Sequence, residues 1–413
     1  MSLFPSKLYS ISSLHNKTNL KRFANWLRNY FQFLSYYLPT IRRWGGRKWW
    51  WSGALLSCAT AAQAQQAVPV APYVVGVYAQ GSFIMAHTPA VSHLAVSHPT
   101  GVELNVQRQT TGTAPWHVWY RYPKVGLSLV YYDYHNPRLG QSYAASVYIS
   151  KPIWRTARQE LNFRLGTGLG YFTTSYDQYD NPRNIMLGSR LNATIQTRVE
   201  YDVAVTEHLG LLLGVGFNHY SNGATTKPNR GINLPSVLLG LNYYQQRAFQ
   251  PQPEALAAEP HDIGRFFLNL STSYSFKQLD EVDQWNHRHY SVFSAAVAVG
   301  HRLNRKSNLL LGLEGFQDQS LRAEQRRDTA QAGRRLPDIK KAGVYLGHEL
   351  LFGRLAFVSH LGVYIYNPYK SNPFYYERLG LKYHFTERIF GDVDLKVHRA
   401  AADALEFRVG VKL

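Results

Sequence analysis

The segment Leu191–Val205 reads LNATIQTRVEYDVAV and alternates apolar with polar side chains along most of its length. A period of two is typical of a β-strand, whose successive side chains point to opposite faces. This strand is longer than the roughly five or six residues usual in soluble sheets. About nine to eleven residues cross a bilayer as a tilted strand. An apolar face opposite Arg198, Glu200 and Gln196 therefore indicates an outer-membrane β-barrel, with lipid outside and polar side chains inside.

The same alternation recurs along the chain and ends with Leu405–Leu413. It predicts an all-β, antiparallel fold of sixteen strands in total, an even number as in bacterial barrels. The predicted strands lie near 72–85, 101–109, 124–134, 141–153, 160–173, 189–205, 208–221, 235–246, 263–276, 287–301, 307–316, 342–352, 354–366, 377–386, 388–398 and 405–413. The long connections 174–188, 222–234 and 317–341 fall at one end of the strands, and this sorting disfavours a soluble β-sandwich.

Residues 248–262 contain three prolines and several small residues between predicted strands eight and nine, which indicates a linker. We therefore expect a barrel over 65–247 and a second barrel-type strand region over 263–413. Two tandem eight-stranded barrels and one sixteen-stranded barrel both fit this pattern, and the alternation itself does not choose between them.

The 413 residues carry 45 Lys and Arg against 26 Asp and Glu, and a single Cys excludes an intramolecular disulfide. Residues 1–64 contain no acid and end in a basic stretch, a short apolar run and Ala62-Gln63-Ala64, which predicts a secretory signal peptide preceded by a mis-annotated extension. The mature chain would begin at Gln65. A basic exported protein favours anionic lipid over nucleic acid as its partner. The sequence is also compatible with a homodimer.

The sequence Gly214-Val-Gly-Phe-Asn-His-Tyr-Ser-Asn-Gly-Ala224 carries the candidate chemistry. His219 and Ser221 are two residues apart on a strand, so their side chains share one face. A histidine beside a serine is the minimum unit of an activated hydroxyl nucleophile. By parity this face continues Leu213 and Val215, which should meet lipid. Polar groups facing lipid are costly unless they serve a function, although both residues could simply mark the exit of the strand into the headgroups.

His219-Tyr-Ser-Asn222 followed by Pro228-Asn-Arg-Gly-Ile232 closely resembles the signature of the lipid A 3-O-deacylase (PagL-type), acyloxyacyl hydrolase-like family. The motif covers about 15 residues, and the family's eight-stranded plan could cover 65–247 but not 248–413. The resemblance implies an outer-membrane hydrolase that removes an ester-linked acyl chain from lipid A of lipopolysaccharide. It implies Ser221 as nucleophile and His219 as its base. It also implies oxyanion-binding or site-shaping roles for Asn222 and Asn229. On physical grounds we expect the backbone N–H groups around Gly223 and Ala224 to help stabilise the oxyanion.

The sequence departs from this family at one position. The family has a glutamate twelve residues after the serine, where this chain has Asn233. An amide can orient a histidine by a hydrogen bond but cannot stabilise an imidazolium by charge. A slower enzyme, an enzyme in which another acid substitutes, and an inactive barrel are all compatible with this change. A non-catalytic channel or structural barrel, and a phospholipase using the same site, therefore remain as alternatives.

The expected chemistry needs no metal or other cofactor, and no HExxH or Cys/His ligand spacing occurs in the chain. Connection 317–341 is rich in Arg and Lys, whose side chains bind phosphate. It is a candidate contact for lipopolysaccharide, although a solvated charged loop explains it equally well. Near the C-terminus, alternation directs His398, Glu406, Arg408 and Lys412 into the lumen, where we expect an ion network.

Overall fold

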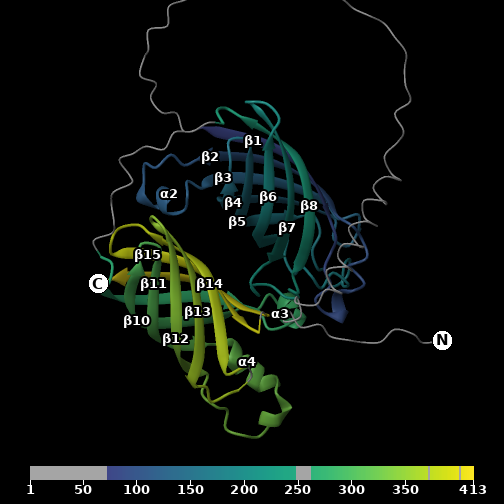
Figure 1. The fold of residues 1–413 in the computed structure, drawn as a ribbon. Helices are drawn as coiled ribbons and strands as arrows, with labels where there is room; N and C mark the ends of the chain where they lie inside the picture. Colours follow the sequence, from purple (N-terminus) through teal and green to yellow (C-terminus); the bar gives the residue numbers. More distant parts are fainter. Residues whose placement is uncertain (1–71, 248–261, 371–372, 400) are drawn as a thin grey trace, which may run out of the picture. The chain divides into compact units, whose positions relative to one another are not determined.

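The structure is a computed structural model that describes residues 72–247, 262–370, 373–399 and 401–413. The predicted signal peptide, 1–64, lies outside the described residues, as does nearly all of the predicted linker, 248–262. Within the described residues the strands form two closed antiparallel barrels of eight strands each (Figure 1). Each of the sixteen predicted strands overlaps one observed strand.

The first barrel is a meander in which each strand pairs with the next one along the chain. It closes where Val77 of the first strand pairs with Leu241 of the eighth. Its strands are β1 (Tyr73–Ser82), β2 (Thr100–Gln109), β3 (Lys124–Asp133), β4 (Gln141–Arg155), β5 (Gln159–Phe172), β6 (Leu191–Ala204), β7 (Leu209–Ser221) and β8 (Ile232–Tyr244).

The second barrel follows the same plan and closes where Val409 of its last strand pairs with Thr272 of its first. Its strands are β9 (Phe266–Lys277), β10 (Tyr290–Asn304), β11 (Ser307–Asp318), β12 (Lys340–Phe352), β13 (Leu355–Tyr366), β14 (Tyr375–His384), β15 (Ile389–His398) and β16 (Ala401–Lys412). Because each barrel closes on itself, the two-barrel alternative is confirmed and the sixteen-stranded barrel is wrong.

In each barrel the longest connections gather at one end of the strands, as predicted. They carry the short helices η2 (Pro89–Val91), α3 (Glu281–Trp285), α4 (Ser320–Arg327) and η4 (Thr329–Gln331). One connection at the opposite end is longer than expected, because residues 110–123 contain α2 (Pro115–Trp119), which Pro115 favours at its first turn. Among the residues that the structure describes, no helix combines the length and apolar character needed to span a bilayer.

The outer faces of both barrels are apolar, as the alternation predicted. Val77, Leu104 and Leu129 of the first barrel and Leu311 and Leu361 of the second each leave about two fifths or more of their surface exposed. A continuous apolar outer face is costly in water but is stabilised by acyl chains. Closure leaves no strand edge with unpaired backbone groups in the lipid.

Buried charges fill the middle of each lumen. In the first barrel Glu103 binds Arg164 at 2.9 Å and Arg198 at 2.6 Å, and the Arg164 guanidinium stacks 3.5 Å from the centroid of the Tyr148 ring. These side chains are almost fully buried, so mutual pairing offsets part of their desolvation. A lumen occupied in this way weighs against an open channel.

The second lumen is organised around Glu314, whose carboxylate binds Arg378 at 2.9 Å and Arg408 at 2.8 Å. Glu406 accepts from Arg378 at 2.9 Å, which confirms the predicted network on this face. His398 also points into the lumen, where its Nε2 lies 3.0 Å from the Tyr364 hydroxyl. Lys412 differs from the prediction: its ammonium lies over the Phe267 ring and forms no ion pair within the described residues.

We expect Arg378→Met to destabilise the protein by about 3–5 kcal/mol, because it leaves Glu314 and Glu406 buried with fewer positive partners. Urea unfolding in lipid vesicles, followed by tryptophan fluorescence, would measure the change. The control is Lys412→Met, which removes a cation–π contact worth about 1 kcal/mol. Equal unfolding midpoints for the two variants would show that the network adds nothing to stability.

Candidate active site

The register of β6, β7 and β8 builds the site. His219 lies two residues before the end of β7, and its direct neighbours are Ile195 on β6 and Asn233 on β8. Directly opposite residues in an antiparallel pair have Cβ atoms about 4.5–5.5 Å apart and point to the same face. The hairpin therefore brings Asn233, fourteen residues away in sequence, beside the imidazole. Ser221, two residues further along β7, is on that face as well.

A chain of hydrogen bonds joins the three predicted site residues. Ser221 Oγ lies 3.0 Å from His219 Nε2, and His219 Nδ1 lies 2.6 Å from Asn233 Oδ1. Since an amide oxygen only accepts, this arrangement places the imidazole proton on Nδ1. The free lone pair of Nε2 then points at the serine hydroxyl, as a general base requires.

His219 and Ser221 face outward, as the alternation along β7 predicted. The apolar side chains before it on the same face of β7, Leu213 and Val215, are about half exposed on the outside of the barrel. His219 is partly buried and Ser221 is 8% exposed. The hydroxyl thus lies on the outer, lipid-facing side of the wall, at the end of the barrel that carries the long connections.

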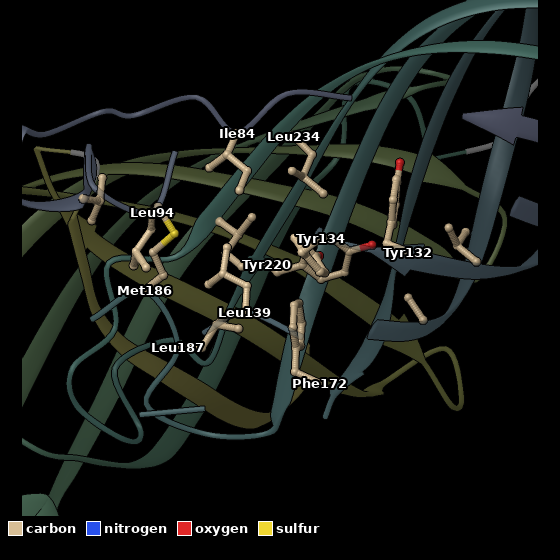
Figure 2. Close-up of a cluster of buried hydrophobic side chains, with 14 residues drawn as sticks. Ile84, Leu94, Tyr132, Tyr134, Leu139, Phe172, Met186, Leu187, Tyr220 and Leu234 are labelled. Carbon is tan, nitrogen blue, oxygen red and sulfur yellow. The ribbon is translucent and has the colours of Figure 1, made fainter. Parts of the chain in front are cut away.

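A buried apolar cluster supports the wall from inside. Tyr220, between His219 and Ser221, is fully buried and packs with residues of the neighbouring strands and of two connections. Figure 2 shows Tyr220 and Leu234 among Leu94, Met186 and Leu187, which come from the connections β1–β2 and β5–β6. Close packing on the inner face fixes the backbone of β7 and β8, so the outward-facing polar group keeps its geometry.

The connection 222–231 begins directly after the serine. Gly223 and Ala224 both have positive φ, which turns the chain sharply after β7. Asn222 Nδ2 donates to Ser189 Oγ at 3.0 Å and to the Thr226 carbonyl at 2.8 Å. The Asn222 amide group is therefore already engaged and shapes the loop.

Asn229 differs from Asn222 in having an unused donor. Its Oδ1 accepts the backbone N–H of Asn222 at 3.2 Å, while its Nδ2 is buried without a partner among the described residues. A buried amide N–H without an acceptor is costly unless something binds it. Of the two loop asparagines, Asn229 is therefore the one whose side-chain N–H group has no acceptor among the described residues.

Gly231 makes room for the imidazole. Its φ is +76°, and a methyl group on its α-carbon would lie 2.9 Å from Cε1 of His219 and 3.0 Å from the Tyr220 carbonyl oxygen. The glycine of the Pro-Asn-x-Gly-Ile motif therefore has a direct steric role beside His219. The sequence pattern contained this residue but gave no indication of that role.

The structure adds one residue that the sequence did not suggest. His87, in the β1–β2 connection, places its Nδ1 3.2 Å from Asn233 Nδ2. It is 146 residues from Asn233 in sequence, and no local spacing links the two. Among the residues described, no group of three or more His, Cys, Asp or Glu side chains could hold a metal ion.

The basic connection 317–341 offers fewer free cations than its sequence indicated. Arg327 pairs with Asp280 at 2.7 Å and with Asp283 at 2.6 Å, and Lys341 is buried in the second lumen. Apart from the paired Arg327, the exposed cations of this stretch are Arg326, Arg334, Arg335 and Lys340. Any contact with lipopolysaccharide phosphates would rest mainly on these four.

Comparison with protein families gives two matches. Residues 100–242 match the model of lipid A 3-O-deacylase (PagL), and residues 266–413 match the model of the acyloxyacyl hydrolase C-terminal domain. Together the two ranges span more than half of the chain. The second match covers the region that the sequence motif left outside the family plan.

Solved structures of other proteins are also similar to parts of this chain or to most of it. Neisserial surface protein A is 10% identical, with 41% of this chain and 96% of that chain covered and a TM-score of 0.29. The outer-membrane enzyme PagL is 18% identical, with coverages of 40% and 97% and a TM-score of 0.28. A porin of Rh. blastica is 10% identical, with coverages of 83% and 99% and a TM-score of 0.19. The comparison with curated proteins found no match.

Proposed function

The chain belongs to the lipid A 3-O-deacylase family, and from that premise we propose that it is a serine esterase acting through Ser221, His219 and Asn233. It is a protein of the bacterial outer membrane. The substrate would be lipopolysaccharide, from whose lipid A the enzyme removes an ester-linked acyl chain. The observation that carries the proposal is the Ser221–His219–Asn233 hydrogen-bond chain on the lipid-facing side of the barrel.

The proposed reaction has two halves. His219 Nε2 takes the proton of Ser221 as Oγ attacks the ester carbonyl, and the imidazolium returns that proton to the leaving alkoxide of the sugar. This leaves an acyl-serine and a free hydroxyl on lipid A. Water then attacks the acyl-serine with His219 as base, which releases a fatty acid and restores the serine.

Stabilisation of the oxyanion would come from the connection 222–231. Asn229 Nδ2 is a buried donor without a partner among the described residues, and the backbone N–H groups of Gly223 and Ala224 come two and three residues after the serine. Preorganised donors of this kind typically contribute about 10²–10³-fold to the rate. The role of Asn222 would be to hold the loop through Ser189 and Thr226.

The position of Ser221 on the outer wall of the barrel favours an ester of a membrane lipid over a soluble ester as the substrate. Leu213 and Val215 are exposed on the outer face, so the acyl chains of a lipid would lie alongside them. The ester linkage of that lipid would lie where its chains meet the headgroup. A glycerophospholipid also presents esters at this depth. Incubating the refolded protein with purified lipopolysaccharide and, separately, with phospholipid vesicles, and weighing the products by mass spectrometry, would distinguish the two substrates.

Asn233→Glu is expected to raise kcat by about tenfold. A carboxylate would accept the His219 Nδ1–H and also stabilise the imidazolium, and hydrogen bonds to charged groups are roughly twice as strong as neutral ones. Initial rates of fatty-acid release from lipopolysaccharide would measure the change. Asn233→Leu serves as the opposite control, because it removes the acceptor and should slow the enzyme. A glutamate variant slower than the parent would show that the site is built for the amide.

A further inference from the structure

We propose that His87 is a positioning residue that lets an amide replace an acid at 233, by holding Asn233 with Oδ1 toward His219. The inference deepens the proposed esterase function and rests on it. It is carried by the contact between His87 Nδ1 and Asn233 Nδ2 at 3.2 Å, at the far end of the Ser221–His219–Asn233 chain.

The backbone holds the His87 segment in place beside β8. Met85 N–H donates to the Asn233 carbonyl at 2.9 Å, and Phe83 N–H donates to the Pro235 carbonyl at 3.3 Å. The chain after β1 therefore continues alongside the start of β8 for several residues. His87 follows two residues after Met85, so its approach to Asn233 is fixed by main-chain hydrogen bonds as well as by its own contact.

An amide at 233 creates a problem that a carboxylate does not have. Both oxygens of a carboxylate accept, so either orientation gives His219 the Nδ1–H tautomer. An amide has one acceptor and one donor, and rotation by 180° would present Nδ2–H to His219 Nδ1. His219 would then carry its proton on Nε2, the atom that must accept the proton of Ser221, and it could not act as base.

His87 selects the productive orientation. Its Nδ1, as an acceptor, favours Nδ2 of Asn233 on its own side and so directs Oδ1 toward His219. The His87 side chain is exposed, so water can satisfy its Nε2–H, and this is the more stable tautomer of a neutral imidazole in water. Within the described residues the Asn233 side-chain amide has only these two histidines as hydrogen-bond partners.

A double-mutant cycle tests the proposal with the full-length protein. We expect His87→Ala to lower kcat about fivefold at unchanged KM, the size of effect that one neutral hydrogen bond supports. In an Asn233→Glu background the same His87→Ala change should alter kcat less than about twofold, because a carboxylate needs no orientation. The control is His93→Ala, since His93 lies in the same connection but contacts the Arg183 carbonyl. An equal loss in both backgrounds would mean a merely structural role and would overturn the proposal.

A spectroscopic measurement separates this inference from the esterase function. The ¹⁵N chemical shifts of the His219 ring should show the Nδ1–H tautomer in the parent and a shift toward Nε2–H in His87→Ala, whether or not the protein turns over lipid. If the tautomer does not change, His87 does not orient Asn233. Absence of deacylation in both the parent and Asn233→Glu, with the tautomer shift present, would reject the esterase alone.

Discussion

Replacement of Ser221 by alanine is expected to abolish deacylation of lipid A, with a loss of at least about 10³-fold in kcat. The variant keeps His219, Asn233 and the oxyanion donors but has no oxygen to form the acyl-enzyme, and loss of the nucleophile in such triads typically costs this much or more. Mass spectrometry of lipid A after incubation with refolded protein would follow the reaction. The parent should release one acyl mass that the variant leaves in place.

The second barrel provides a matched control for this substitution. Ser359 also faces outward, is partly buried and lies directly opposite His348 on the neighbouring strand. Within the described residues no hydrogen bond joins this serine to that histidine, so Ser359→Ala should leave the rate unchanged. Retained activity in Ser221→Ala would refute Ser221 as the nucleophile. Loss in both variants would indicate a general effect on folding.

Gly231→Ala is expected to lower kcat by about 10²-fold while the barrel stays folded. The added methyl group would lie 2.9 Å from His219 Cε1, too close for an unshifted ring, and 3.0 Å from the Tyr220 carbonyl oxygen, which belongs to the backbone. A displacement of about 1 Å in a catalytic group typically costs this factor. Kinetics of fatty-acid release, together with a shift of the folded band on unheated gels, would separate catalysis from folding.

Gly333 is the control for backbone strain. Its φ of +72° is close to that of Gly231, but a methyl group there would meet no atom within 4 Å. Gly333→Ala therefore imposes the same kind of conformational strain without touching a site. If Gly231→Ala were as active as Gly333→Ala, the imidazole would have room to move and the steric argument would fail.

The strands and their faces could be predicted from the sequence because both depend on local rules. A period of two along residues such as Leu191–Asp202 predicts a strand and also indicates which of its side chains face lipid. The same rule placed His219 and Ser221 on one outward face, next to each other. Strand geometry alone places the two side chains of a His-x-Ser sequence on the same face. The proximity of His219 and Ser221 could therefore be predicted without any tertiary contact.

The lumen networks were only partly predictable. Parity showed that Glu406 and Arg408 point inward. It did not show that Glu406 would pair with Arg378 and that Arg408 would pair with Glu314, which lie on other strands. Those contacts depend on the stagger of strands around a closed barrel. The number of barrels could not be predicted either, because two barrels of eight strands and one barrel of sixteen share the same alternation. Hydrogen bonds between distant strands decide between them.

The sequence by itself determined the strand count, the lipid-facing side of each strand, the family motif and the adjacent base and hydroxyl, because these follow from local spacing. Only the tertiary structure decided which strands close each barrel, that Asn233 lies directly opposite His219, and that His87 reaches Asn233 from a connection 146 residues away. The physical reason is that register and closure are set by backbone hydrogen bonds between segments far apart in the chain. No local periodicity encodes which of those segments will meet.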